Sequence, residues 1–304
     1  MSSHGIRPFV WMLCGCAWFS AMSLLSSRLG QERVPWQTIA TVRSSVAFLL
    51  ALLIAIVTGV KLVAVGPRAL WLRSIAGSCS MLATFFALAN LTASEVLTLT
   101  NTFPVWVAVL SWPMLGEKPS SGVWIAVCIS VVGVALAVYP TDETARMFRL
   151  VPALAAVAAA FFTALAMLGL SRLKTLAPMA IVVHFSGVAT VVCASGFLLF
   201  PVRQDGPKPF EIPEMTARLL AVGFTAMIGQ IFLTLAFSRG TATKIAVVGL
   251  SQIVMVMVVE AAAGWRTFTP MNLFGTLLIL GPTAWLMARA RKPRTPPPEP
   301  VAIE

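Results

Sequence analysis

Ten long apolar segments fill most of the chain, and they form two similar halves of five segments each. The segments span residues 8–27, 35–59, 69–90, 93–115, 121–139, 150–171, 177–200, 216–238, 242–263 and 271–289. Each approaches the ~20 apolar residues that a helix needs to cross the hydrocarbon core of a bilayer. The turn at 87–95 in the first half resembles the turn at 236–244 in the second. Because five is an odd number, the second half must enter the membrane in the opposite orientation, which makes the repeat an inverted one.

The composition supports a membrane protein built only of helices. Hydrophobic residues make up 58% of the chain and charged residues 11%, whereas soluble domains carry roughly 25% charged residues. Only helices and closed barrels satisfy every backbone polar group in lipid, and the sequence lacks the alternating strands of a barrel. We therefore expect an all-α membrane protein with ten transmembrane helices, in two inverted five-helix repeats at 1–139 and 150–289. The basic, proline-rich residues 290–304 predict a disordered cytoplasmic tail that can contact anionic lipid headgroups.

The distribution of positive charge predicts the orientation. The net charge of +11 comes from residues at segment ends and not from one patch, which argues against a nucleic-acid partner. Thirteen Lys and Arg residues, Arg73 among them, fall on the side of the N-terminus and eight on the other, with Arg43 inside a segment. The positive-inside rule then places both termini in the cytoplasm of a plasma (bacterial inner) membrane. The first segment also resembles a cleaved signal peptide, but an uncleaved helix is favoured because it preserves the five-plus-five symmetry.

Enzymatic and ATP-driven functions have no visible machinery in the sequence. The connections are too short for a soluble catalytic domain, and no P-loop, GxSxG elbow or HExxH motif is present. All five cysteines lie inside predicted segments, which indicates packing and not a disulfide framework or a metal site. We therefore expect no enzyme activity, no cofactor and no metal.

Several short motifs follow one another in a fixed order. They are Ala87-Leu88, Ala93-Ser94-Glu95, Phe103-Pro104-Val105, Leu115-Gly116-Glu117 and Gly133-Val134, then Ala236-Phe237, Thr243-Lys244 and Gly275 through Gly281. In order and spacing they resemble the EamA-type carriers of the drug/metabolite transporter superfamily, over residues 8–289. The resemblance implies ten helices in two inverted halves and ATP-independent transport of small metabolites, such as amino acids, amines, carboxylates, nucleotide-like compounds or vitamins. The second half departs from the pattern, because a shift of 149 residues sets Gln252 and Ile253 opposite Phe103 and Pro104.

Two ionisable side chains inside the segments are candidate contacts for a solute. A charge inside a bilayer is costly, by at least ~2.5 kcal/mol on insertion scales. Arg43 in the second segment either bonds to neighbouring carbonyl groups or meets a carboxylate or phosphate of a substrate. His184 in the seventh is either a packing and hydrogen-bonding residue or a proton-linked or substrate contact. No Asp or Glu lies near the middle of a segment, which argues against a carboxylate proton relay and against a simple organic cation as substrate.

Neutral side chains supply the other candidates. Some lie four residues apart and so share a helix face, and others lie at related positions in the fourth and ninth segments. They are Trp18, Ser80, Thr84, Asn101, Phe103, Pro104, Gln230, Thr234, Ser251 and Gln252. Pro104 removes a backbone hydrogen bond, so a bend there would expose carbonyl groups to a central cavity. Polar side chains also join transmembrane helices, by roughly 0.6–2 kcal/mol each, so part of the set is expected to be structural.

Together these features predict a secondary carrier whose two halves rock around a site near the membrane midplane. The expected substrate is an amino acid or a related carboxylate-bearing metabolite that is exported, and an uptake carrier for a vitamin or organic anion is the alternative. A non-transporting membrane scaffold or receptor is a different class, and it would not need polar residues at matching depths of both halves. The expected partners are a small-molecule solute and membrane lipid, and a homodimer remains open.

Overall fold

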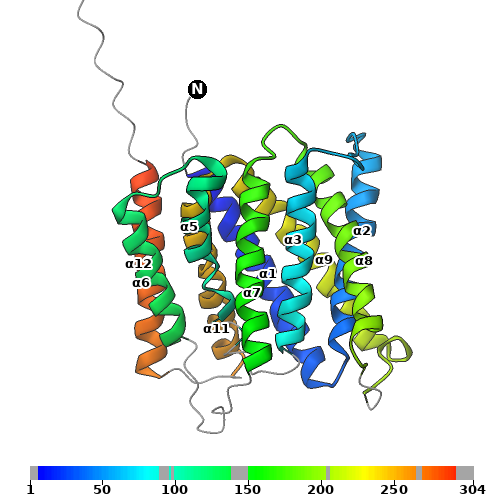
Figure 1. Ribbon diagram of the computed structural model, residues 1–304. Helices are drawn as coiled ribbons and strands as arrows, with labels where there is room; N and C mark the ends of the chain where they lie inside the picture. Colours follow the sequence, from blue (N-terminus) through cyan, green and yellow to red (C-terminus); the bar gives the residue numbers. More distant parts are fainter. Residues whose placement is uncertain are drawn as a thin grey trace, which may run out of the picture.

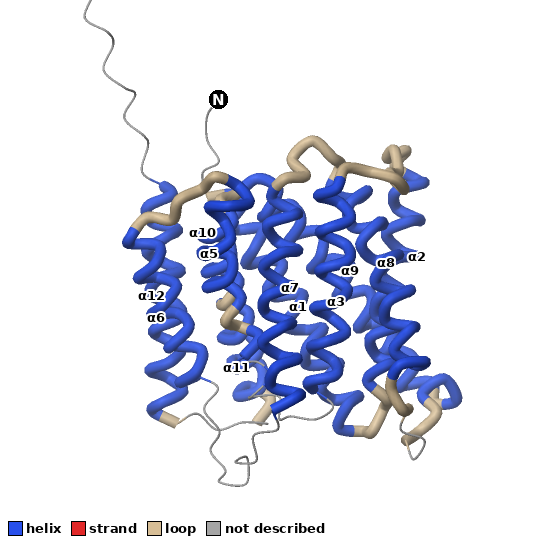
Figure 2. Tube along the Cα trace, in the orientation of Figure 1, coloured by secondary structure: helices blue, strands red, loops and turns tan. Residues whose placement is uncertain are grey.

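The computed structural model describes residues 6–88, 96, 99–137, 150–202, 206–264 and 269–291. Figures 1 and 2 show their helices standing side by side in one bundle, with no strand in this described part. The helices are α1 (Arg7–Gln31), α2 (Trp36–Val57), α3 (Arg68–Leu88), α5 (Phe103–Leu115), α6 (Ser121–Ala137), α7 (Leu150–Ser171), α8 (Pro178–Leu199), α9 (Pro213–Arg239), α10 (Ala242–Gly249), α11 (Ser251–Ala262) and α12 (Pro270–Arg291), with a 3₁₀ turn η2 at Pro209–Glu211. Counting α10 and α11 as one interrupted span, these described helices match the ten predicted segments, and the all-α architecture is confirmed.

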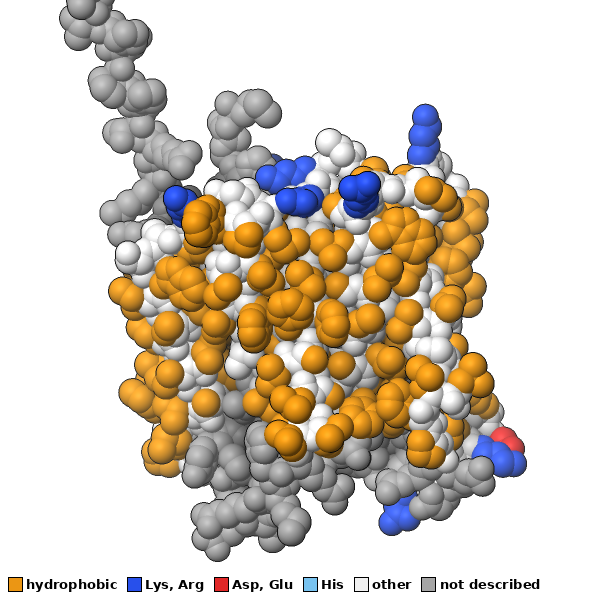
Figure 3. Space-filling model, viewed as in Figure 1, with side chains coloured by type: hydrophobic (Ala, Val, Ile, Leu, Met, Phe, Trp, Pro, Cys, Tyr) orange, Lys and Arg blue, Asp and Glu red, His pale blue; other side chains and the backbone are white. Residues whose placement is uncertain are grey.

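The outer surface of the bundle is apolar over most of its height. Seven spans of the described chain are long and apolar enough to cross a membrane, and α5, α6 and α12 supply shorter apolar helices. Figure 3 shows apolar side chains over the middle of the visible face and Lys and Arg near its two ends. Large side chains such as Leu53 on α2 and Leu277 on α12 are exposed on this surface. So wide an apolar belt needs lipid as its neighbour, and the chain is an integral, multi-pass membrane protein.

Proline and glycine mark several helix ends. α5, α8 and α9 carry a proline in their first two positions, where its missing N–H needs no partner and its fixed φ suits the helix. Gly116 ends α5 with φ 70°, and its N–H donates to the carbonyl of Trp112, a C-terminal cap that favours glycine. These ends lie beside the connections between consecutive helices.

The two halves pack on each other in an exchanged pattern. α1 packs along α9 and α3 packs along α7, while α2 contacts α9 and α8 contacts α3. α2 also packs on α8, and α6 packs on α12. Exchanging α1, α2, α3 and α6 for α7, α8, α9 and α12 reproduces every one of these contacts. Such self-consistent pairing is what a two-fold relation between two bodies produces.

Equivalent helices of the two halves run in opposite directions. In Figure 1, α1 starts and α12 ends at the same end of the bundle, which we call the terminal end, and the opposite one is the far end. α1 runs away from the terminal end, whereas α7 runs toward it. The connections α2–α3, α5–α6, α7–α8 and α9–α10 therefore all lie at the terminal end.

α6 and α12 approach each other closely at a glycine. A Cβ atom added at Gly133 on α6 would lie 2.8 Å from the carbonyl oxygen of Gly275 and 2.8 Å from Cβ of Leu278, both on α12. One of these neighbours is a backbone atom, so it can yield only if one helix moves. Gly133 therefore sets the separation of the two helices.

Replacing Gly133 with alanine is expected to lower the stability of the protein. Overpacking costs about 1–3 kcal/mol, more than the ~1 kcal/mol that alanine gains over glycine inside a helix. The measurement is the melting temperature in detergent, followed by tryptophan fluorescence. Gly281→Ala on α12 is the matched control, because a Cβ there would meet nothing within 4 Å. Equal melting temperatures for the two variants would contradict the close contact.

The structure corrects the path of two predicted segments. The segment 93–115 was expected to bend at Pro104, but the described chain makes a turn at Asn101 and Thr102 and α5 begins at Phe103. Pro104 thus opens a helix instead of bending one, because a first-turn proline breaks no hydrogen bond. The segment 242–263 was expected to be continuous, and it is interrupted at Leu250. The turn motif around 89–95 lies outside the described residues.

Candidate functional site

The interruptions of the two halves have the same hydrogen-bond pattern. Around Thr102, the N–H of Thr102 donates to Leu99 O at 3.3 Å, and the N–H of Val105 donates to Thr102 O at 3.0 Å. Around Leu250, the N–H of Leu250 donates to Val247 O at 3.1 Å, and the N–H of Ile253 donates to Leu250 O at 3.1 Å. All four bonds join residues three apart instead of four, so the helix tightens locally at related places in the two halves.

The two interruptions lie close to each other inside the bundle. α5 packs against α10, and the Phe103 side chain packs against the apolar cluster that contains Leu250 and Ile253. A Cβ at Gly249, the last residue of α10, would lie 3.6 Å from Cζ of Phe103 and 2.8 Å from Cε of Met12 on α1. The small residue at Gly249 therefore lets α1, α5 and α10 meet at the interruption.

α1 supplies polar partners to the second interruption. The Cys16 thiol donates to Gly249 O at 3.4 Å, and the Ser20 hydroxyl donates to Gln252 O at 3.1 Å. The Gln252 side-chain amide donates to the Ser23 hydroxyl at 3.3 Å. A hydrogen-bond donor beside a helix interruption satisfies backbone carbonyl groups that lipid cannot satisfy. Sequence reasoning missed Cys16 and Ser20, whose partners are more than 200 positions away in the chain.

Among the predicted site residues, the structure brings Phe103, Pro104, Ser251 and Gln252 to this region. Pro104 and Ser251 are buried, and the hydroxyl of Ser251 has no hydrogen-bond partner among the described residues. Asn101 lies in the turn that precedes α5. A buried hydroxyl without a protein partner is uncommon, and it is available to a polar solute that reaches the interruption.

Other predicted residues make hydrogen bonds within the helix bundle. The Ser80 hydroxyl on α3 contacts the hydroxyl of Thr163 at 2.6 Å and donates to Ala159 O at 2.9 Å, which joins α3 to α7. The Thr84 hydroxyl donates to Ser80 O at 2.8 Å. These contacts are of the kind that joins transmembrane helices.

The structure places two further predicted residues, Gln230 and Thr234, on α9 and a third, Trp18 of α1, against α9. Gln230 and Thr234 share a buried face of α9, and the Thr234 hydroxyl donates to Gln230 O at 2.7 Å. The Trp18 ring packs edge-on against Phe224 at 6.2 Å between centroids, and Phe224 is exposed on the outside of the bundle. Trp18 therefore lies at the α1–α9 contact near the outer surface.

A second polar region lies between α2, α3 and α8, apart from the interruptions. A terminal nitrogen of Arg43 on α2 lies 2.5 Å from the Met81 sulfur on α3. His184 on α8 shares a 2.7 Å hydrogen bond between its Nδ1 and the Ser74 hydroxyl, and its ring packs edge-on against Trp71 at 4.7 Å. These contacts match the packing and hydrogen-bonding role for His184.

Arg73 is the residue of this region that the sequence analysis misplaced. The charge pattern grouped it with basic residues at segment ends, but the structure buries it to 1% exposure. Its guanidinium lies over the Phe185 ring on α8, 4.1 Å from the centroid. The fact that Arg73 falls inside the predicted segment 69–90, and not in a connection, was the available signal for its burial.

Two cavities of about 320 Å³ each open at opposite ends of the bundle. The cavity at the terminal end is lined by Met114, Leu115, Glu117, Ser171, Arg172, Lys174 and Gly240. The cavity at the far end is lined by Leu24, Ser27, Arg28, Gln31 and Glu260. The first lies beside the ends of α5 and α7, and the second beside the ends of α11 and α1, so the two cavities occupy equivalent positions in the two halves. The first combines Glu117 with Arg172 and Lys174, and the second combines Glu260 with Arg28.

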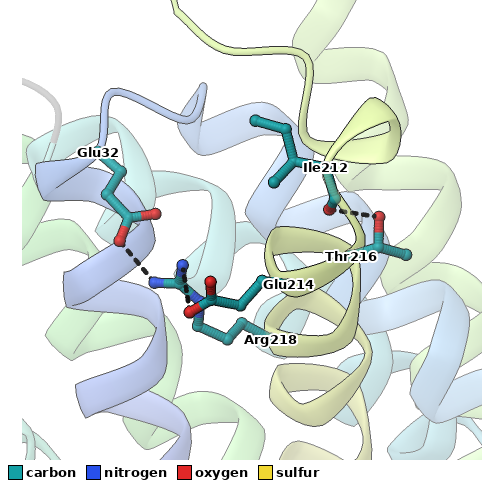
Figure 4. A network of polar contacts seen from close by, with 5 residues as sticks. All are labelled: Glu32, Ile212, Glu214, Thr216 and Arg218. Atoms are coloured by element: carbon teal, nitrogen blue, oxygen red, sulfur yellow. Dashed lines mark hydrogen bonds and ion pairs between the residues drawn. The ribbon is translucent and has the colours of Figure 1, made fainter.

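An ion-pair network joins α1 and α9 at the far end. Figure 4 shows Arg218 of α9 between Glu32, at the end of α1, and Glu214. Its two terminal nitrogens lie 2.5 Å from Glu32 Oε1 and 3.2 Å from Glu214 Oε1. The nearby Thr216 hydroxyl donates to Ile212 O at 3.2 Å. The network fastens two helices that pack along each other, so it braces the far end of the α1–α9 pair.

Comparison with known proteins identifies relatives in sequence and one protein of similar fold. Residues 7–139 match the model of the EamA-like transporter family. The pseudopaline exporter CntI of Pseudomonas aeruginosa is 29% identical over 250 residues, which cover 81% of this chain and 82% of the exporter. An uncharacterized transporter of Helicobacter pylori is 26% identical over 193 residues, covering 62% of this chain and 63% of that protein. One protein of known crystal structure, at 17% identity, superposes with a TM-score of 0.79 over 93% of this chain and 97% of its own, which shows a common fold.

Proposed function

We propose that the chain is a secondary transporter that exports small polar metabolites without ATP, because residues 7–139 match the model of the EamA-like transporter family. The observation that carries the proposal is the pair of matched helix interruptions, at Thr102 and Leu250, in contact inside the bundle. Interrupted helices at the interface of two repeats are where secondary transporters bind their solutes, because unwound backbone and free polar groups face the pathway there. The two repeats are residues 1–139 and 150–289.

The packing of the two halves supports alternating access. Each half contacts the other through equivalent helices, so a rocking motion can exchange one packing arrangement for its counterpart. The two cavities lie at equivalent positions at opposite ends, which is where such a motion would open and close the pathway. Ser251 and Gln252, beside Phe103, are then the solute contacts nearest the centre, and Asn101 and Pro104 complete the first interruption.

The proposed substrate is an amino acid or another carboxylate-bearing metabolite. Arg43 supplies a partly buried cation, and no described helix carries an acidic residue near its middle. The relative whose function is named is an exporter, which favours export over uptake. A cationic solute would find no counter-charge inside the described part of the bundle.

The proposed location is the bacterial inner membrane with both termini in the cytoplasm. Lys61, Arg68, Lys118 and Lys174 lie in or beside the connections at the terminal end. The positive-inside rule puts the end richer in Lys and Arg in the cytoplasm. Export then runs from the terminal end to the far end.

Counterflow in liposomes tests the proposal. Liposomes containing the purified full chain are loaded with an unlabelled solute, and entry of the same labelled solute is followed without ATP. The panel is alanine, glutamate, succinate, butyrate and the diamine putrescine, with protein-free liposomes as the control. We expect exchange of one or more acids and none of putrescine. A folded protein that exchanges no member of the panel, or putrescine alone, would contradict the proposal and favour a scaffold or receptor.

A further inference from the structure

We propose that the region between α2, α3 and α8 is an anion site that binds two acidic groups of one small solute, one at Arg43 and one at Arg73. Both side chains reach into the interior from different helices. Neither is paired with a carboxylate of the described residues, whose ion pairs involve Lys208 and Arg218. The inference concerns binding, and it rests on the proposed function only where the bound dianion is taken to be the transported solute.

The two guanidinium groups are placed along one face of α3. A terminal nitrogen of Arg73 lies where a Cβ of Gly77 would be, and Arg43 reaches α3 at Met81. Gly77 and Met81 are one turn apart, which is a rise of about 6 Å along the helix. A spacing of this order between the two contact points on α3 suits two carboxylates at the ends of a short chain.

Each of the two arginines has a buried nitrogen whose hydrogen bond is not satisfied by the described residues. The Nε atoms of Arg43 and Arg73 are buried and have no hydrogen-bond partner in the described structure. The contacts that the guanidinium groups do make are with the Met81 sulfur and the Phe185 ring, and neither neutralises a charge. A buried charge is normally paired or hydrogen-bonded, and a guanidinium matches the geometry of a carboxylate through two parallel bonds. Two guanidinium groups with unsatisfied hydrogen-bond donors therefore indicate a ligand with two carboxylates.

The local sequence makes room for this arrangement. A Cβ at Gly77 would lie 2.8 Å from Cε2 of Phe185 as well as against the Arg73 guanidinium. The backbone of Arg73 is itself approached by α7, because a Cβ at Gly169 would lie 3.2 Å from Arg73 N. Gly169 thus lets α7 approach the backbone of Arg73, and Gly77 leaves room on α3 for the Arg73 guanidinium and the Phe185 ring.

Calorimetric titration of the purified full chain tests the site. The probes are succinate, with two carboxylates, and butyrate, with the same carbon chain and one, in a buffer free of chloride and sulfate. We expect succinate to bind at least tenfold more tightly than butyrate. Arg43→Gln and Arg73→Gln should each remove this preference, while Arg68→Gln, at an exposed position on the same helix, should keep it. Arg43→Lys and Arg73→Lys keep a charge, and they should bind succinate better than the Gln variants.

The outcomes separate this inference from the proposed function. Equal affinity for succinate and butyrate, or a preference that survives both Gln substitutions in folded protein, would overturn the two-arginine site. If such a protein still exchanges an acid in liposomes, the transporter proposal stands without this site. Succinate binding that needs both arginines, in a protein that exchanges nothing, would support the site and sink the transporter proposal.

Discussion

Replacing Arg73 with methionine is expected to stabilise the solute-free protein while lowering its affinity for succinate at least tenfold. Arg73 is buried to 1% exposure without a carboxylate partner. Burying a charge in a bilayer costs at least ~2.5 kcal/mol, and a buried ionic group is often replaced by an apolar one of similar size with a gain of about 1–4 kcal/mol. Methionine keeps an unbranched chain that can pack on Phe185. A residue that lowers stability yet is needed for binding is typical of functional sites.

Melting temperature and titration, measured on the same preparation, check both parts of this prediction. Arg68→Met on the same helix is the control, because Arg68 is exposed and its replacement should change neither quantity much. A lower melting temperature for Arg73→Met would mean that the guanidinium packing on Phe185 stabilises the fold by more than its burial costs. In that case Arg73 is a structural residue.

Replacing Gly249 with leucine is expected to reduce solute exchange in liposomes to less than a tenth of the wild-type rate. The new side chain would start 2.8 Å from Cε of Met12 and would point toward Phe103, so it would fill the meeting point of α1, α5 and α10. Overpacking of this kind costs about 1–3 kcal/mol. Because the proposed motion of the two halves passes through this interruption, the same wedge should hold it in one arrangement.

Counterflow of the solute that the wild-type protein exchanges best measures this effect. Gly281→Leu on α12 is the matched control, since no atom lies within 4 Å of a Cβ there, and it should exchange at close to the wild-type rate. A folded Gly249→Leu protein that exchanges as fast as wild type would show that the interruption at Leu250 is not on the solute pathway.

The positions of the helices could be predicted from sequence because lipid leaves few choices. An apolar run of sufficient length must satisfy its own backbone, so α1, α2, α7 and α8 begin and end within a few residues of the predicted segments. The interruption at Leu250 could not be predicted in this way. Residues 245–254 are almost entirely apolar and contain no proline, and the donors that satisfy the freed carbonyl groups come from α1.

The candidate site shows the same limit. Arg43 was identified because a charge stands out inside an apolar segment. Arg73 lies near the start of its segment, and its burial depends on Gly77 beside it and on Phe185 more than 100 positions later. Contacts between residues so far apart in the chain cannot be recognised from the local sequence pattern. The roles of the twelve predicted site residues stay predictions until binding or transport is measured.

The exchanged packing of the helices also constrains how the protein is made. α1 emerges from the ribosome well before α9, the helix that covers most of its buried face and that follows about 200 residues later. Large proteins generally fold part by part from the N-terminus as they are synthesised, but here the first five spans lack the helices that they pack against. The first five spans must then stay in the lipid with their small and polar faces uncovered until the second five spans are inserted. We therefore expect that neither half is a folding unit and that the bundle closes only after the spans of the second half have been inserted.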